Sequence, residues 1–155
     1  MDSAALKETQ DVEREFAIEL DLHHSYQFDV KFDLPSIADL RVDETPPIGE
    51  GAGPSPTRML ATSIGHCLAS SALFCLRKAR IDVQGMTATV KGELVRNEEG
   101  HLRVGRMAVE LAPRVAAKDV PRMQRCLEIF EDFCVVTGAV RKGIDVDVAV
   151  SPVTT

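Results

Sequence analysis

The residues of this sequence best suited to chemistry are four cysteines, Cys67, Cys75, Cys126 and Cys134. The thiolate is the reactive form of a cysteine, and a nearby cation or helix N-terminus stabilises it against the opposing effect of burial. A peroxide oxidises a thiolate to a sulfenic acid, which condenses with a second thiol to a disulfide. Two cysteines that meet in the fold would therefore be sufficient for reversible redox chemistry.

Structural disulfides and a zinc site are less consistent with the sequence than thiols that pack or carry out redox chemistry. The first residues show no apolar signal region, so we expect a cytoplasmic protein whose cysteines remain thiols. Tight C-x2-C pairs are absent from the sequence, and its histidines fall outside the spacing of a zinc finger. These are His23, His24, His66 and His101. We therefore expect no metal and no cofactor.

The spacing of the cysteines excludes some disulfides. Cys67 and Cys75 are eight residues apart on one predicted helix, which separates them by about 12 Å and places them beyond disulfide reach. The same argument excludes Cys126 with Cys134 if their helix is continuous. Because cysteine is among the most commonly buried residues, Cys75 and Cys126 are interpreted as core residues.

A long central helix carries the first two of these cysteines. Pro56 suits the first turn of a helix, with Ser55 as its cap, and the apolar spacing continues to the basic residues at 77–80. The apolar residues wind around much of the circumference, so we expect the helix to be buried nearly all round. His66 points about 100° away from Cys67 around the helix, and it is not predicted to act as a base.

The remaining elements predict an α+β domain. Alternating apolar residues indicate a half-buried hairpin over residues 15–33, a short strand over 39–44, and a second hairpin over 82–113. Helical spacing indicates a helix over 118–133 and a further short one over 134–143, and strict alternation predicts a closing strand over 144–150. We expect one domain over residues 12–155, after a disordered leader at 1–11.

Composition limits the classes of partner. Of the 155 residues, 45% are hydrophobic and 27% charged, with a net charge of −6. This charge argues against nucleic acid as a partner. Charged residues interrupt the apolar stretches before the length of a membrane span, so no membrane partner is expected either.

Two segments carry a family resemblance. GAGPSPTRMLATSIGHCLASSALFCLRKARIDVQG has a Gly-rich loop, a Ser-Pro helix start and a cysteine deep inside the helix, while FEDFCVVTGAVRKGIDVDVAV has a cysteine followed by helical turns, Gly and a terminal strand. Both resemble the OsmC/Ohr family of osmotically inducible and organic hydroperoxide resistance proteins. The resemblance implies an OsmC-like fold, with two antiparallel sheets wrapped around long central helices. It also implies an intertwined homodimer with active sites at the subunit interface.

The resemblance also implies roles for two cysteines. Enzymes of the family reduce hydroperoxides with their first cysteine as nucleophile and their second as resolving thiol, and these positions match Cys67 and Cys134. The resulting disulfide would be reduced by an external dithiol. We therefore expect a thiol-dependent peroxidase that reduces organic hydroperoxides in oxidative-stress defence.

The sequence departs from the peroxidase pattern at two points. Peroxidases of the family carry a glutamate directly after the Ser/Asn-Pro proline, where this sequence has Thr57, and an early-strand arginine, which residues 16–33 lack. Neighbouring segments contain residues that could replace the missing arginine and glutamate. These are Arg41 or Arg58 as the cation, and Glu44 or Glu50 as the acid.

The departures leave other hypotheses open. One is a non-catalytic OsmC-like dimer that binds a small apolar ligand in an interfacial pocket. Another is a redox sensor with a separate downstream partner. A Cys67 that reacts with peroxide no faster than a free thiol would indicate the binding protein.

Overall fold

The computed structural model describes residues 11–155, so nearly all of the predicted leader lies outside the described residues. The described chain forms two compact units, whose boundary lies between Pro56 and Thr57. The order of strands and helices is that of an α+β fold, which confirms the predicted class.

The first unit is a three-stranded antiparallel sheet in the order β1-β2-β3. Its strands are β1 (Ile18–His24), β2 (Gln27–Phe32) and β3 (Leu40–Val42). The predicted hairpin and third strand are thus present. The prediction that this hairpin is half-buried is wrong for β1, where all seven residues are exposed.

The loop after β3 is organised around one buried carboxylate. Asp43 is 2% exposed and accepts hydrogen bonds from the backbone N–H groups of Glu44, Glu50 and Ala52, at 2.8, 3.0 and 3.0 Å. The N–H bonds from Ala52, Glu50 and Glu44 lower the pKa of Asp43, although burial opposes them. A Cβ at Gly49 would collide with the Glu44 carbonyl, so this turn requires glycine. The Pro- and Gly-rich segment is therefore a shaped loop.

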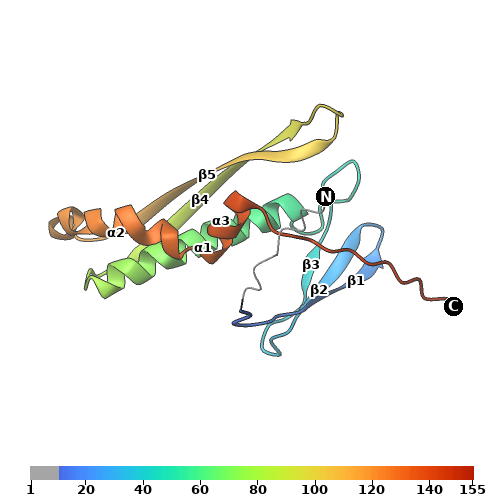
Figure 1. Cartoon of the computed structure of the whole chain (residues 1–155), viewed down its shortest axis with the longest axis horizontal. Coiled ribbons are helices and arrows are strands. Elements are labelled where there is room, and N and C mark those ends of the chain that lie inside the picture. The colour runs from blue at the N-terminus through green and yellow to red at the C-terminus, as the bar shows by residue number, and fades with distance from the viewer. Residues whose placement is uncertain (1–10) are drawn as a thin grey trace, which may run out of the picture. The chain divides into compact units, whose positions relative to one another are not determined.

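The second unit is built on helix α1 (Pro56–Lys78), which begins at the predicted proline and runs along a long hairpin (Figure 1). That hairpin is formed by the antiparallel strands β4 (Gly85–Arg96) and β5 (Leu102–Arg114). Four short helical segments follow: η1 (Ala117–Met123), α2 (Gln124–Ile129), η2 (Phe130–Phe133) and α3 (Val135–Lys142). The predicted continuous helix over 118–133 is therefore wrong, since 3₁₀ turns interrupt it.

Two apolar clusters hold α1 in place. Near its C-terminal end, Leu76 packs with Ile81, Met123 and Cys126. Around its middle, Ile64 and Leu68 pack with Cys134 and with side chains of β5. Helix α1 thus contacts β5 and the helical segments after it.

Only part of the circumference of α1 is buried, so the prediction of burial nearly all round is wrong for the single chain. Its buried residues are Ile64, Gly65, Leu68, Ala72 and Leu76, whereas Phe74 is 65% exposed. Helix α1 is long and apolar enough to cross a membrane, so the expectation that charged residues interrupt every apolar stretch before that length is wrong for this helix. Core helices of soluble proteins share this property.

The predicted closing strand is also wrong for the single chain. Residues 144–150 join no sheet in the part of the chain that the structure describes, and they run on from α3 as an extended segment (Figure 1). All their side chains are exposed, including those of Ile144, Val146, Val148 and Val150. The alternation of this segment is real, but the single chain provides no partner strand.

Candidate active site

The second unit brings together the two cysteines that the resemblance singled out. Cys67 lies half-buried on α1, and Cys134, which is 2% exposed, lies at the start of α3. Both belong to the cluster of Ile64 and Leu68. The two sulfurs are close enough for each to affect the titration of the other.

Cys134 is the N-cap of α3, with extended backbone angles of φ −80° and ψ 100°. Its sulfur accepts a hydrogen bond from the backbone N–H of Thr137 at 3.4 Å, and it is also hydrogen bonded to the Thr137 hydroxyl, with Sγ and Oγ1 3.0 Å apart. Thr137 is itself buried. A sulfur therefore occupies the place where Ser, Thr, Asp or Asn more often caps a helix.

The first turn of α3 also donates hydrogen bonds to Cys67. Hydrogen bonds from the backbone N–H groups of Val136 and Val135 favour the thiolate of Cys67. Together with the Thr137 N–H, they are the N–H groups that a helix leaves without partners at its start. The positive end of the helix dipole thus faces both sulfurs, in a segment with no arginine nearer than Arg141 in the last turn.

The two thiols ionise with different ease. Burial raises the pKa of Cys67, and the neighbouring Cys134 raises it further. Burial also acts to raise the pKa of Cys134, but the hydrogen bonds from Cys67 and Thr137 outweigh it, so that this pKa is lowered. The first proton therefore leaves the pair as a unit more easily than it would leave one buried cysteine, and the second proton stays between the two sulfurs.

Replacing Thr137 by Val removes the hydroxyl and preserves the backbone N–H bond. We expect the first pKa of the thiol pair to rise by about one to two units, because a hydrogen bond to a charged group contributes roughly 1.5–3 kcal/mol. Less thiolate would then be present below that pKa, and the thiolate would recover as the pH rises above it. Thiolate ultraviolet absorbance against pH measures this shift.

Thr137→Ser is the matched control for this titration, since it keeps the hydroxyl and should keep the low pKa. An unchanged titration in Thr137→Val would show that the hydroxyl does not stabilise the Cys134 thiolate.

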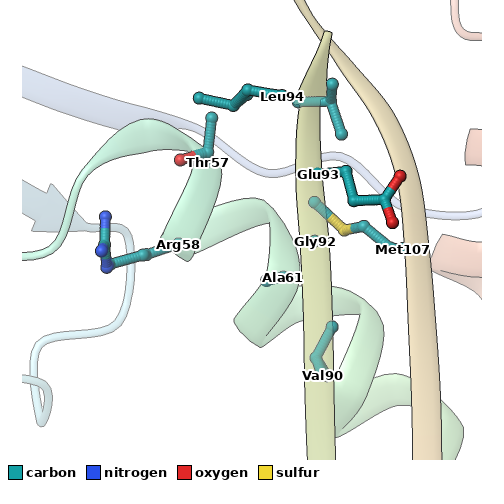
Figure 2. Close-up of a pocket in the computed structure, with 9 residues that line it drawn as sticks. Thr57, Arg58, Ala61, Val90, Gly92, Glu93, Leu94 and Met107 are labelled. Carbon is teal, nitrogen blue, oxygen red and sulfur yellow. The ribbon is translucent and has the colours of Figure 1, made fainter.

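A cavity of about 320 Å³ lies between the start of α1 and the β4–β5 hairpin (Figure 2). Its walls combine polar and apolar surface in similar amounts, and its charged residues are Arg58 and Glu93. The Arg58 side chain points away from β4, where Glu93 lies (Figure 2). Cys67 does not line this cavity, but Met107 lines it and also packs in the cluster of Cys67.

The other residues suggested as replacements for the missing arginine and glutamate lie in the first unit. Arg41 donates from Nε to Asp29 Oδ1 at 2.6 Å and from Nη1 to Gln27 Oε1 at 3.4 Å. Gln27 in turn donates to Glu50 Oε2 at 2.8 Å. Gln27 thus links Arg41, the suggested cation, to Glu50, a suggested acid. The backbone N–H of Glu44, the other suggested acid, donates to Asp43. The bond to Asp29 raises the pKa of Arg41.

Sequence reasoning missed Thr137, Gln27 and Asp29. Thr137 had a detectable signal, since it stands three residues after Cys134, the spacing of a helix cap and its partner. Gln27 and Asp29 gave none, because their roles depend on the register of β2 beside β3. His66 is exposed on α1. Within residues 11–155, no three His, Cys, Asp or Glu side chains gather in a way that could hold a metal ion.

The fold and the paired thiols define an α+β protein with a dithiol site between a central helix and a helix N-terminus. The family model described as OsmC-like protein matches residues 49–149. The chain belongs to the OsmC-like protein family, as the resemblance implied. No curated protein sequence matches the chain.

Solved structures agree with this fold. An OsmC-like protein from Mycoplasma pneumoniae has a TM-score of 0.70 at 12% identity, with coverage of 84% of this chain and 89% of that chain. The organic hydroperoxide resistance protein OsmC from Legionella pneumophila has a TM-score of 0.65 at 14% identity, covering 84% and 92%. For the organic hydroperoxide resistance protein OhrB from Bacillus subtilis the TM-score is 0.60 at 14% identity, covering 85% and 94%. At these identities the likeness shows the fold.

Proposed function

We propose that this protein is a thiol-dependent peroxidase that reduces organic hydroperoxides, with Cys67 as the nucleophile and Cys134 as the resolving thiol. The observation that carries the proposal is the meeting of the two sulfurs at the N-terminus of α3, whose N–H groups favour their anionic forms. Cys67 is the less buried of the two, so a substrate reaches it first.

The reaction starts with one proton shared by the pair. When that proton moves from Cys67 to Cys134, the Cys67 thiolate attacks the terminal peroxide oxygen and the O–O bond breaks. The leaving alkoxide takes the proton from Cys134 and departs as an alcohol. Cys67 is then a sulfenic acid, and the Cys134 thiolate is ready to attack it.

The second step closes the disulfide. The Cys134 thiolate attacks the Cys67 sulfur, and the S–O bond breaks to release hydroxide, which solvent protonates. One hydroperoxide and two thiols have then become one alcohol, one water and one disulfide. An external dithiol restores the pair by thiol–disulfide exchange.

Single-turnover oxidation of the reduced protein by cumene hydroperoxide tests this function. We expect rapid loss of two thiols and a disulfide between Cys67 and Cys134, at a rate at least about 100-fold above that of a free thiol, whose pKa is near 8.5. Thiol counting and peptide mass mapping report both quantities. A Cys67 that oxidises no faster than a free thiol would leave non-catalytic binding of a small apolar ligand as the better explanation.

That alternative, a non-catalytic protein for a small apolar ligand, has one observation in its favour. Part of the wall of the cavity beside α1 is apolar, and this part suits such a ligand; it includes Val90, Leu94, Val104 and Met107. Ligand binding that is unaffected by oxidation or substitution of Cys67 would support it.

The functional form proposed is a homodimer. The apolar side chains of β1 and of residues 144–150 are exposed, and the latter alternate as a strand would. A second copy of the chain provides the edge strand and the apolar surface that both segments need. The active site would then be completed next to the subunit interface.

Removing residues 144–155 should therefore abolish the dimer. We expect the full chain to have the mass of a dimer by light scattering, and the chain ending at Gly143 to have that of a monomer. Replacing Asp145 and Asp147 by Asn is the control, because it keeps the apolar alternation and should keep the dimer. A full-length monomer at micromolar concentration would contradict the proposal.

A further inference from the structure

A second pair of cysteines meets in the same unit. Cys75 packs against the cluster of Leu76, Ile81, Met123 and Cys126, and the Cys75 thiol affects the titration of Cys126. Cys75 lies eight positions after Cys67, and Cys126 lies eight positions before Cys134. Helix α1 and the segments that contact it thus carry two successive pairs of facing sulfurs.

The two pairs are separate sites. Eight residues of α1 correspond to about 12 Å, which is beyond the reach of a disulfide or of direct exchange between the pairs. A disulfide at one pair therefore does not pass to the other without large movement of the helices.

Their surroundings also differ. Burial raises the pKa of Cys126 to about 11, and the neighbouring Cys75 contributes to this, while Arg125 opposes it. The first pair, in contrast, lies at the start of α3 and receives its N–H groups. The second pair consequently remains protonated under conditions in which the first pair is already reactive.

A cavity of about 320 Å³ reaches Cys126. Its lining is mainly apolar, with Leu76, Met86, Met123 and Phe130 beside the cysteine. A small apolar molecule fits such a space, whereas a charged or strongly hydrated oxidant does not. Apolar hydroperoxides are thus the class of oxidant that this site would admit.

We propose that Cys75 and Cys126 form a second redox site, which small apolar hydroperoxides convert to a disulfide that fastens α1 to α2. The small ionised fraction of Cys126 is the reacting form: its thiolate attacks the terminal peroxide oxygen, the O–O bond breaks, and the leaving alkoxide takes from solvent the proton that Cys126 released and departs as an alcohol. The Cys75 thiol then attacks the sulfenic acid, and its proton leaves with the hydroxyl group as water. Two thiols and one hydroperoxide give one disulfide, one alcohol and one water.

The consequence differs from catalytic turnover. The disulfide closes a loop of about 50 residues that contains the whole β4–β5 hairpin, and a loop of this length strongly restricts the unfolded chain. Closing it would stabilise the second unit against unfolding. The proposal does not depend on the peroxidase function, because neither Cys67 nor Cys134 takes part.

The test uses the full chain with Cys67→Ser and Cys134→Ser, in which only the second pair can react. Cumene hydroperoxide in excess should remove both remaining thiols, with loss of two hydrogen atoms and a cross-linked peptide joining Cys75 to Cys126. We expect this oxidation to be about 10- to 100-fold slower than that of the first pair in the unaltered chain. The melting temperature should rise by on the order of 10 °C.

The same variant with Cys75→Ser added is the matched control, because Cys126 alone cannot close the disulfide or gain the stability. Peptide mapping of the unaltered chain after excess oxidant decides the question if the variants fold poorly. Two separate cross-links support the proposal there. Persistent thiols at Cys75 and Cys126, or their independent oxidation to sulfinic acids, would overturn it whether or not the first pair reacts.

Discussion

Replacing Cys67 by Ser is expected to abolish the fast reaction with hydroperoxides. A serine hydroxyl is not ionised at neutral pH and forms no sulfenic acid, so the second-order rate with cumene hydroperoxide should fall by at least about 1,000-fold. Stopped-flow oxidation and a sulfenic acid trap measure the loss.

Cys75→Ser is the matched control for this prediction. It lies on the same helix, is also partly buried, and makes the same exchange of sulfur for oxygen eight residues further on. It should leave the fast phase unchanged. A fast phase that survived in Cys67→Ser would move the attack to another cysteine and reverse the proposed roles.

Local patterns in the sequence predicted most of the fold. Pro56 marks the first residue of α1, and residues 82–113 contain most of the β4–β5 hairpin. Gly143, with φ 83°, ends α3 as predicted. Each of these features depends on residues a few positions apart, which is the distance over which propensity and periodicity are informative.

The incorrect predictions concern contacts that local patterns do not define. The all-round burial of α1 and the strand at residues 144–150 were read from apolar residues, but apolar character alone does not say which chain covers them. In the single chain Phe74 and Val148 are exposed. In the proposed dimer, a second copy of the chain would cover these positions.

In the candidate site, too, local features were predictable and contacts between distant segments were not. The resemblance selected Cys67 and Cys134, and the structure brings them together. It also brings Cys75 to Cys126, which local spacing left as separate core residues, because the fold places α2 beside the C-terminal half of α1. Helix packing determines the distance between two cysteines, and the residues next to each cysteine in the sequence do not indicate it.

The other large effect is expected from Cys134→Ser, which should separate attack from resolution. Serine still accepts the N–H bond of Thr137 as a helix cap, so α3 should form normally. Cys67 should still react in single turnover, about tenfold more slowly because its proton partner is lost. Its sulfenic acid then has no neighbouring thiol and should persist or oxidise to the sulfinic acid.

Turnover with an external dithiol should consequently fall by about 100-fold in Cys134→Ser, even though the first oxidation survives. Mass spectrometry would show one added oxygen atom where the unaltered chain loses two hydrogen atoms. Cys126→Ser provides the comparison, since it removes a buried thiol but leaves the first pair intact, and it should turn over normally. If Cys134→Ser instead abolished the first oxidation, the lowered pKa of Cys134 would be the functional one and Cys134 would be the nucleophile.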